Sequence, residues 1–418
     1  MNPKDETSFI VTSNKPPNNG FLPKDADFST TAIHAGHSPD QWSSMAITTP
    51  ISLSSAFKLQ APDQNPQFAY SRCNNPTRNV LETCLAALEG VKYGFTFASG
   101  VGTVSAIGQL LNSGDRIICT DQVYGGTYRY FSEVVGKSGI SVSFIDVNDF
   151  EKIDQVLDQN TKLIWLENPT NPLMKVIDIR AIARYVKSKN PDIIVVVDNT
   201  FLTPYFQKPL ALGADISVYS VTKYMNGHTD VIMGAAVTDS ETIHSNLRII
   251  QSASGAVPSP FDCYLVDRSL KTLSIRMKQH MKNGLKVARF LENHPLIAKV
   301  LHPGLESHPG HEIAKQQWSG CSGMLSFYLK GNLEDVKLFI SKLKYFTCAY
   351  TLGGFESLVA VPSLMSHNAI PPAVREKLGI IDNLVRLSVG LESVDALIED
   401  LNQALLSVQT IQKKKTVI

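Results

Sequence analysis

Chemically reactive side chains follow three short apolar stretches of the sequence. They are Glu167 and Asn171 after the first stretch, Asp198 after the second, and the segment Ser220-Val221-Thr222-Lys223 after the third. A lysine amine can bond covalently to a carbonyl carbon, and a buried carboxylate can keep a ring nitrogen protonated. A lone aspartate after a strand is usually a turn former and a lone lysine usually faces solvent, so it is the combination that indicates chemistry.

Strands that alternate with helices must position these residues. The runs predicted as strands are Arg116–Cys119, Ser141–Ile145, Lys162–Leu166, Ile193–Val197 and Ile216–Tyr219. The stretches Val147–Asn160 and Ile179–Lys189 each have room for one helix. Unbroken apolar strands of this kind are typical of a parallel sheet covered on both faces. Because ligands bind beyond the carboxyl ends of such strands, we expect the reactive residues to meet in one crevice.

The chemistry that suits this combination is that of pyridoxal phosphate. Lys223 would bind the cofactor covalently, and Asp198 would keep its pyridine nitrogen protonated so that the ring accepts electrons. The phosphate needs N–H donors at the start of a helix, which Phe97–Thr103 would supply by opening a helix that runs to Leu111. Ser220 and Thr222 would add hydroxyl donors. A tight turn would explain the glycines of Phe97–Thr103 equally well.

Six motifs, in order, resemble the Cys/Met-metabolism family of pyridoxal-phosphate enzymes over about residues 28–408. They are Tyr70–Asn79, Asp121–Thr127, Glu167–Pro172, Asp198-Asn199-Thr200, Ser220–Tyr224 and Leu352–Ser357. The resemblance implies an α/β, aspartate-aminotransferase-like fold (PLP fold type I) whose large domain has a mostly parallel sheet. It also implies that the protein is an enzyme and that pyridoxal 5'-phosphate is its cofactor.

The pattern of the sequence changes after about residue 265. Long helical stretches such as Ser269–His294 and Leu333–Lys344 are mixed there with strand-like segments such as Ser322–Tyr328. This pattern predicts a smaller α+β domain. We therefore expect an N-terminal arm over residues 1–65, a PLP-binding large domain over 66–268 and a C-terminal small domain over 269–418. The first 28 residues are polar and are predicted to form a solvated arm.

The resemblance implies a role for each matching residue around the cofactor. Lys223 would be the catalytic lysine that also moves protons, and Tyr124 would stack on the cofactor ring and take part in proton transfer. The residues that would hold the phosphate are Gly100, Val101, Ser220 and Thr222. Tyr70 and Arg72 would complete the phosphate site of a neighbouring subunit. This implies a homo-oligomer with shared active sites, at least a dimer and, by resemblance, a tetramer.

The resemblance also implies a set of substrate-binding residues. They are Asn171, Arg386, Arg72, Arg129, Tyr350 and Thr351. Arg386 lies in the strand-like run Leu384–Gly390, where a charged side chain needs a buried anionic partner. Without the family match, an intramolecular ion pair would explain Arg386 about as well as a substrate carboxylate.

Within the family, the chain most resembles eukaryotic cystathionine γ-lyases. This implies cleavage of the Cγ–S bond of L-cystathionine to L-cysteine, 2-oxobutanoate and ammonia, with hydrogen sulfide release from cysteine or homocysteine as a related activity. Three departures from that pattern stand out. Tyr350 stands where γ-lyases typically carry Glu and bacterial β-lyases carry Tyr, Cys73-Asn74 replaces Ser-Gly, and Val101 replaces Leu or Met. Cystathionine β-lyase, methionine γ-lyase and cystathionine γ-synthase therefore stay open as alternatives.

Composition excludes several other classes of protein. The 418 residues include 39 Lys and Arg and 38 Asp and Glu, a net charge of +1 that gives no attraction to nucleic acid or anionic membrane. The longest apolar runs fall far below the ~20 residues of a membrane span.

Six scattered cysteines without metal-ligand spacing predict reduced thiols in the cytoplasm and no metal site. A dinucleotide-binding Gly-x-Gly-x-x-Gly is absent at residues 100–105, and a non-catalytic relative would be expected to lack Lys223 or Asp198.

Overall fold

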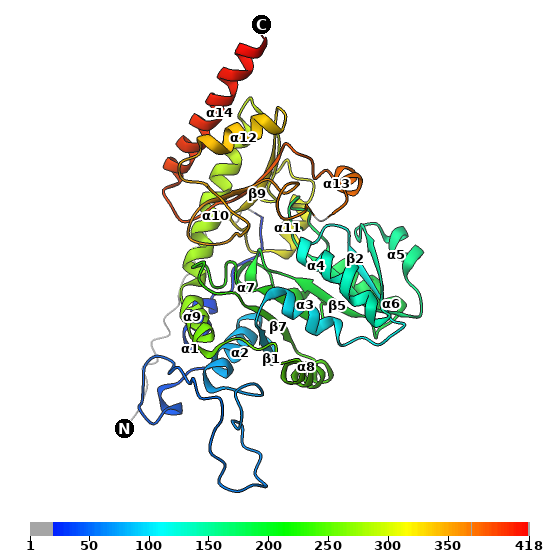
Figure 1. Cartoon of the computed structure of the whole chain (residues 1–418), viewed down its shortest axis with the longest axis vertical. Coiled ribbons are helices and arrows are strands. Elements are labelled where there is room, and N and C mark those ends of the chain that lie inside the picture. Colours follow the sequence, from blue (N-terminus) through cyan, green and yellow to red (C-terminus); the bar gives the residue numbers. More distant parts are fainter. Residues whose placement is uncertain (1–19, 369, 417–418) are drawn as a thin grey trace, which may run out of the picture.

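A computed structural model describes residues 20–368 and 370–416 of the chain. The first 19 residues of the predicted solvated arm therefore lie outside the described residues. Two separate sheets organise the described part, and the smaller one lies toward the projecting C-terminal helix in Figure 1. In the part of the chain that is described, no helix combines the length and the apolar character needed to cross a membrane.

The larger sheet has seven strands in the order β1-β7-β6-β5-β4-β2-β3. They are β1 (Tyr93–Phe97), β2 (Arg116–Thr120), β3 (Ser141–Ile145), β4 (Thr161–Glu167), β5 (Ile194–Asp198), β6 (Ile216–Ser220) and β7 (Gly234–Thr238). The five strands predicted from apolar runs are confirmed, and all of them are parallel. The sequence analysis missed β1 and β7, and β7 runs antiparallel to both of its neighbours. Both strands contain glycine or alanine where the others carry β-branched residues, which weakened their signal.

Helices cover both faces of this sheet, as predicted. Those of the first 270 residues are α1 (Phe28–His34), α2 (Pro76–Glu89), α3 (Gly100–Gly108), α4 (Gly125–Arg129), α5 (Phe150–Val156), α6 (Ile179–Lys189), α7 (Thr203–Phe206), α8 (Glu241–Ser254) and α9 (Pro260–Leu270). Val104 of α3 and Leu247 of α8 pack in one core with Phe97, whereas α5 and α6 pack in a core on Ile164 and Val195. The helix predicted to run to Leu111 ends at Gly108. Because both faces are buried, ligands can reach the sheet only at its strand ends.

The smaller sheet has five strands in the order β10-β11-β12-β9-β8. Its strands and the surrounding helices are α10 (Leu273–Glu292), β8 (Ile297–Leu301), α11 (His311–Gln317), β9 (Met324–Leu329), α12 (Leu333–Lys342), β10 (Thr347–Cys348), β11 (Leu358–Ala360), α13 (Pro372–Leu378), β12 (Leu384–Ser388) and α14 (Val394–Thr416). This confirms a smaller α+β unit. Its boundary between residues 268 and 269 stays a prediction, because α10 contributes Met277 to one core and Leu291 to another.

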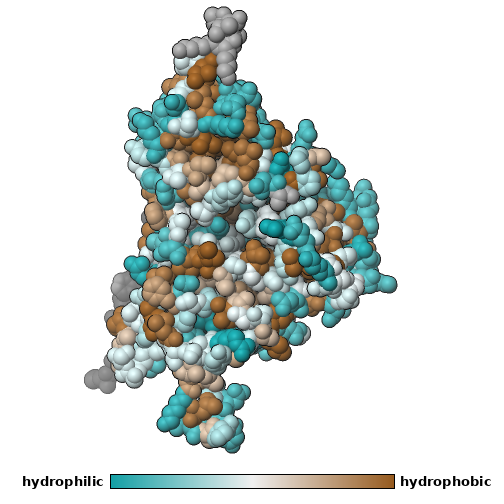
Figure 2. Space-filling model, viewed as in Figure 1, coloured by the Kyte–Doolittle hydropathy of each residue, from teal (hydrophilic) through white to brown (hydrophobic). Residues whose placement is uncertain are grey.

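Part of the predicted N-terminal arm packs on the body, and part projects from it. Phe28 and Ala32 of α1 are buried in a core with helix α2. The segment near residues 55–70 extends away from the body at the bottom of Figure 1, and Figure 2 shows apolar residues on this projection. Among the exposed apolar side chains of this region are Leu53, which is 70% exposed, and Tyr70, which is 46% exposed. Such exposure is typical of a surface that another chain covers.

Candidate active site

The carboxyl ends of β4, β5 and β6 bring the reactive residues together. Glu167 ends β4 beside Asp198 of β5, and Ser220 ends the next strand, β6. A cavity of about 240 Å³ opens at this edge of the sheet. Of the predicted site residues, those that line it are Gly100, Val101, Tyr124, Asn171, Asp198, Ser220, Thr222, Lys223, Tyr350 and Arg386. The crevice expected from the strand ends is thus present, and the small domain closes one side of it through Tyr350 and Arg386.

Lys223 projects its amine into this cavity. Its Nζ donates a hydrogen bond to Thr351 Oγ1 at 2.9 Å. Burial, helped by the positive charge of Arg386, lowers the pKa of Lys223 to about 8. A far larger share of this amine than of an ordinary lysine is therefore neutral near physiological pH. The neutral amine is the form that attacks a carbonyl carbon or takes up a proton.

Glu167, which is buried, and Asp198, which is half-buried, are neighbouring carboxylates on β4 and β5. Asp198 Oδ1 accepts hydrogen bonds from Thr200 N at 3.0 Å and from Thr200 Oγ1 at 2.6 Å. Glu167 accepts hydrogen bonds from the backbone N–H groups of Tyr124 at 2.8 Å and Asn171 at 2.9 Å. Burial raises the pKa of both carboxyls, and the charge of Asp198 raises that of Glu167 further. A cation beside Asp198, such as a protonated ring nitrogen, would relieve this repulsion.

The start of α3 forms a narrow cradle against β6. Ser99 caps this helix by accepting a hydrogen bond from Gly102 N at 3.0 Å. A Cβ added to Gly100 would lie only 3.1 Å from the Ser220 side chain, so glycine lets the helix start approach Ser220 closely. Thr222 Oγ1 bridges the backbone N–H and carbonyl of Met233. N–H groups at a helix start and an adjacent hydroxyl are suited to bind a phosphate.

Tyr124 lies across the mouth of the cavity. Its ring packs on Gly126, where an added Cβ would come within 2.4 Å of a ring carbon. The same Cβ would lie 3.1 Å from the Val101 side chain. Tyr124 and Val101 therefore both border Gly126. The ring is 44% exposed and is free to cover a planar ligand.

Arg386 is a buried cation in the wall of the cavity. It lies on β12, is 3% exposed, and has a pKa that burial lowers to about 10. Its Nη1 donates a hydrogen bond to Asn171 Oδ1 at 3.0 Å and its Nη2 donates one to the Thr351 carbonyl at 3.3 Å. None of the ion pairs formed within residues 20–368 and 370–416 involves Arg386. The intramolecular ion pair that the sequence left open is therefore not found, and the guanidinium is available to an anionic ligand.

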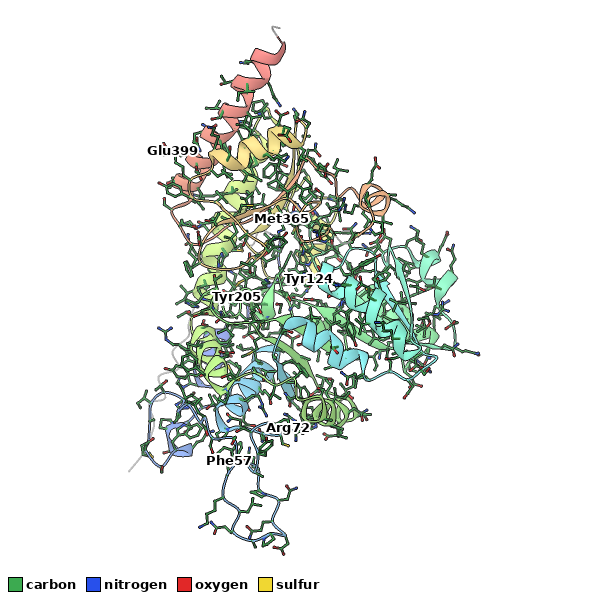
Figure 3. All side chains as sticks on the ribbon, in the orientation of Figure 1. Phe57, Arg72, Tyr124, Tyr205, Met365 and Glu399 are labelled. Carbon is green, nitrogen blue, oxygen red and sulfur yellow. The ribbon has the colours of Figure 1, made fainter. Side chains whose placement is uncertain are left out.

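Four predicted site residues are not among those that line the cavity. One of them, Thr351, nevertheless contacts Lys223 through its hydroxyl. The other three lie elsewhere on the molecule. Arg129 is on the surface, where it pairs with Glu133 at 3.1 Å. The Arg72 guanidinium lies 5.5 Å from the centre of the Tyr70 ring. Figure 3 shows Arg72 toward the lower end of the molecule, far from Tyr124. One chain alone does not bring Tyr70, Arg72 or Arg129 to Lys223, and their roles stay predictions.

Other residues of the site escaped the sequence analysis. Thr200, which holds Asp198, also accepts a hydrogen bond from Ser220 N at 2.8 Å. Its place in the Asp198-Asn199-Thr200 motif was a usable signal. Ile232 lines the cavity although nothing in its local sequence points there. Of the three departures from the γ-lyase pattern, Cys73 contacts the Ser252 hydroxyl at 3.2 Å, and Tyr350 stands at the cavity with 66% of its surface exposed.

Comparison with known proteins agrees with this geometry. The chain matches the model of the Cys/Met metabolism PLP-dependent enzyme family over residues 29–406. The protein belongs to this family. As a Cys/Met metabolism enzyme it uses pyridoxal phosphate and acts on a small amino acid substrate. It is 54% identical to the cystathionine gamma-lyase of Sus scrofa over 386 residues, which are 92% of this chain and 95% of that protein. The cystathionine gamma-lyase of Homo sapiens is equally similar, at 54% over the same shares.

Solved structures of this family share the fold. The cystathionine gamma-lyase from Lactobacillus plantarum, complexed with L-serine, matches with a TM-score of 0.88 at 40% identity over 91% of this chain and 99% of that chain. The cystathionine gamma synthase from Xanthomonas oryzae pv. oryzae, in complex with aminoacrylate and cysteine, matches with a TM-score of 0.89 at 38% identity over 93% of this chain and all of that one. The expected aspartate-aminotransferase-like fold is thus confirmed.

The residues of the cavity fit pyridoxal phosphate. The amine of Lys223, the carboxylate of Asp198 and the cradle between Gly100 and Ser220 supply the three kinds of group that the aldehyde, the ring nitrogen and the phosphate need. When bound, the cofactor supplies an aldehyde for a covalent link and a ring that withdraws electrons from the substrate. Asn171 and Arg386 lie on the same cavity as Lys223 and would orient an amino acid by its carboxylate.

Proposed function

We propose that the protein cleaves the Cγ–S bond of L-cystathionine. With one water molecule, the products are L-cysteine, 2-oxobutanoate and ammonia. The 54% identity to cystathionine gamma-lyases over 92% of the chain supports this activity over the others of the family. The observation that carries the proposal is the buried Arg386, which has no ion pair in the described chain and lies on one cavity with Lys223. This arrangement is suited to an amino acid that presents its carboxylate beside the cofactor.

The residues of the site can perform the proton transfers that this cleavage needs. A proton must leave Cα and then Cβ, and the departing sulfur must receive one. Lys223 is the base, because its pKa is lowered to about 8 and its amine lies in the cavity. Tyr124 protonates the sulfur, and its position in the lining of the cavity with its side chain partly exposed supports this role. Arg386 and Asn171 hold the carboxylate, so that Lys223 acts on the neighbouring carbon.

A product assay tests this proposal. Purified enzyme given L-cystathionine should release 2-oxobutanoate and cysteine in equal amounts. Release of pyruvate and homocysteine in their place would contradict γ-cleavage. Lys223→Ala is the matched control, because it removes the base and should abolish both sets of products.

One observation favours cystathionine β-lyase as a second candidate. Tyr350 lines the cavity where the resemblance to γ-lyases leads one to expect a glutamate. Its phenol provides no carboxylate for the distal amino group of cystathionine, so a substrate can sit differently against Lys223. A single residue at the rim changes discrimination by about 1–3 kcal/mol, which shifts a product ratio more readily than a reaction class. We therefore place β-cleavage second.

We also propose that the enzyme is a cytoplasmic homo-oligomer, at least a dimer and by resemblance a tetramer, that shares its active sites between subunits. Lys223 and Arg386 are the only lysine and arginine among the residues that line the cavity of the described chain, so the phosphate cradle lacks a cation of its own. Tyr70 and Arg72 are exposed and lie outside the cavity, where they are available to a second subunit. Light scattering at assay concentration tests this assembly, and an active monomer would contradict it.

A further inference from the structure

A buried arginine holds the loop that carries Tyr70 and Arg72. Arg78, on α2, is 1% exposed. Its Nη1 donates a hydrogen bond to the Ser71 carbonyl at 2.7 Å, and its Nη2 donates one to the Arg72 carbonyl at 3.3 Å. A planar guanidinium that holds two consecutive carbonyls fixes the orientation of the peptide between them. The backbone at Arg72 is therefore fixed to α2 by the two hydrogen bonds from Arg78.

Glu82 joins Arg78 to the strand that leads into the phosphate cradle. Its side chain is 4% exposed, and its Oε1 lies 3.8 Å from Arg78 Nε. The same oxygen accepts hydrogen bonds from Thr96 N at 2.9 Å and Thr96 Oγ1 at 3.0 Å. Thr96 belongs to β1, and four residues later Gly100 opens α3. One carboxylate thus supports both the cradle of its own subunit and, through Arg78, the projecting loop.

Helix α8 fixes the same two segments from the other side. Gln251 Nε2 donates hydrogen bonds to Glu82 Oε1 and to the Thr96 carbonyl, both at 2.8 Å. The next residue, Ser252, accepts a hydrogen bond from Arg72 Nη1 at 2.5 Å through its carbonyl oxygen. The loop is therefore tied at its backbone by Arg78 and at its side chain by α8. These contacts restrict the conformations in which the loop can meet a second subunit.

We infer that Arg78 is a positioning residue that presents the Tyr70–Arg72 loop to the cofactor phosphate of the neighbouring subunit. This inference rests on the shared active site proposed above. Arg78 touches neither cofactor nor substrate, because it is buried on α2 and does not line the cavity. Its effect must therefore appear in the affinity of the neighbouring site for its phosphate-bearing cofactor.

The affinity for the cofactor gives a first test. Arg78→Lys keeps the positive charge but cannot hold both carbonyls in a fork. We expect it to weaken cofactor binding by at least about tenfold, measured as the cofactor left after dialysis against cofactor-free buffer. The matched control is Arg248→Lys. Arg248 also contacts Glu82, at 3.1 Å, but it makes no contact with the loop, and its replacement should leave cofactor retention close to wild type.

Mixed oligomers separate an effect on the neighbour from a general loss of structure. Subunits with Arg78→Lys are produced together with an increasing excess of subunits with Lys223→Ala. Borohydride then makes permanent only the cofactor linked to Lys223, so the measurement reports the sites of the Arg78→Lys subunits alone. These sites receive an intact loop from their Lys223→Ala neighbours. We expect cofactor retention at these sites to rise toward the wild-type value as the excess increases.

Two outcomes would overturn the inference. Unchanged cofactor retention in the pure Arg78→Lys enzyme would show that Arg78 does not position the loop. Retention that stays low in every mixture would show that the defect acts within the same subunit. Neither outcome depends on which carbon–sulfur bond is cut, so the proposed reaction is tested separately. A monomer in light scattering would instead contradict the assembly itself, and the inference with it.

Discussion

The Arg386 guanidinium donates a hydrogen bond to Asn171 Oδ1 at 3.0 Å across the junction of the two sheets. Arg386 belongs to the small sheet, whereas Asn171 follows β4 of the large one. The amide leaves the positive charge of the guanidinium uncompensated. We therefore propose that this pair forms an anion site with one half in each domain, on the cavity that also holds the amine of Lys223.

Replacement of Arg386 by methionine should have separate effects on substrate binding and on the stability of the fold. Arg386→Met should raise the KM for L-cystathionine by at least about 100-fold, because a buried bidentate contact to a carboxylate is lost. The free energy of unfolding should stay the same or rise, since a buried charge without an ion pair is replaced by an apolar side chain of similar length. Steady-state kinetics and thermal unfolding of the same preparation check both effects. A strongly destabilised variant would instead indicate a structural role.

The lowered pKa of Lys223 predicts how cofactor attachment depends on pH. Only the neutral amine reacts, so the rate of attachment to enzyme freed of cofactor should rise as pH increases through about 8. Stopped-flow absorbance measures this rate. Because the charge of Arg386 contributes to the lowered pKa, Arg386→Met should move the midpoint to higher pH. A midpoint near that of an ordinary lysine in the unmodified enzyme would refute the prediction.

Tyr350 predicts a change in substrate preference. Tyr350→Glu places a carboxylate at the cavity, where it can bind the distal amino group of cystathionine. Its kcat/KM for cystathionine, relative to that for cysteine, should rise by up to about 100-fold, corresponding to 1–3 kcal/mol. Tyr350→Phe serves as the control, since it removes only the hydroxyl. An equal change in both variants would show that the added charge is not what matters.

Buried histidines predict a loss of stability in acid. Burial lowers the pKa to about 4 in four of them, His280, His302, His308 and His367. In the unfolded chain a histidine has a pKa near 6.5, so the folded state binds fewer protons below that pH. Above about pH 6.5 these histidines do not lower the free energy of unfolding. Between about pH 6.5 and 4, each of them lowers it by about 1.4 kcal/mol for every pH unit of acidification.

The midpoint of thermal unfolding, measured from pH 7.5 to 5, checks this prediction. His302→Asn is the informative variant, because an asparagine oxygen can replace Nδ1 as acceptor for Gly304 N while it does not titrate. This variant should lose less stability than the unmodified enzyme as the pH falls. An unfolding midpoint that does not change between pH 7 and 5 would argue against the prediction.

The sequence was sufficient to predict which residues follow the five apolar strands of the large sheet, but it did not predict β1, β7 or the order of the strands. Asp198 and the segment ending at Lys223 could be read as functional because each comes directly after an apolar run. The pairing of Glu167 with Asp198 depends on β4 lying next to β5, which local periodicity does not encode. The contact between Lys223 and Thr351 joins residues 128 positions apart, so it arises only from the packing of one domain on the other.

The active site is built from two separate stretches of the sequence, one in the large domain and one in the small domain. The lysine, the carboxylate and the phosphate cradle all come from residues 99–223, whereas Tyr350, Thr351 and Arg386 come from residues 350–386. Mutations in the second stretch can therefore alter which amino acid is accepted while the machinery that carries the cofactor is inherited intact. After gene duplication, such a layout gives descendants a short route to new sulfur substrates.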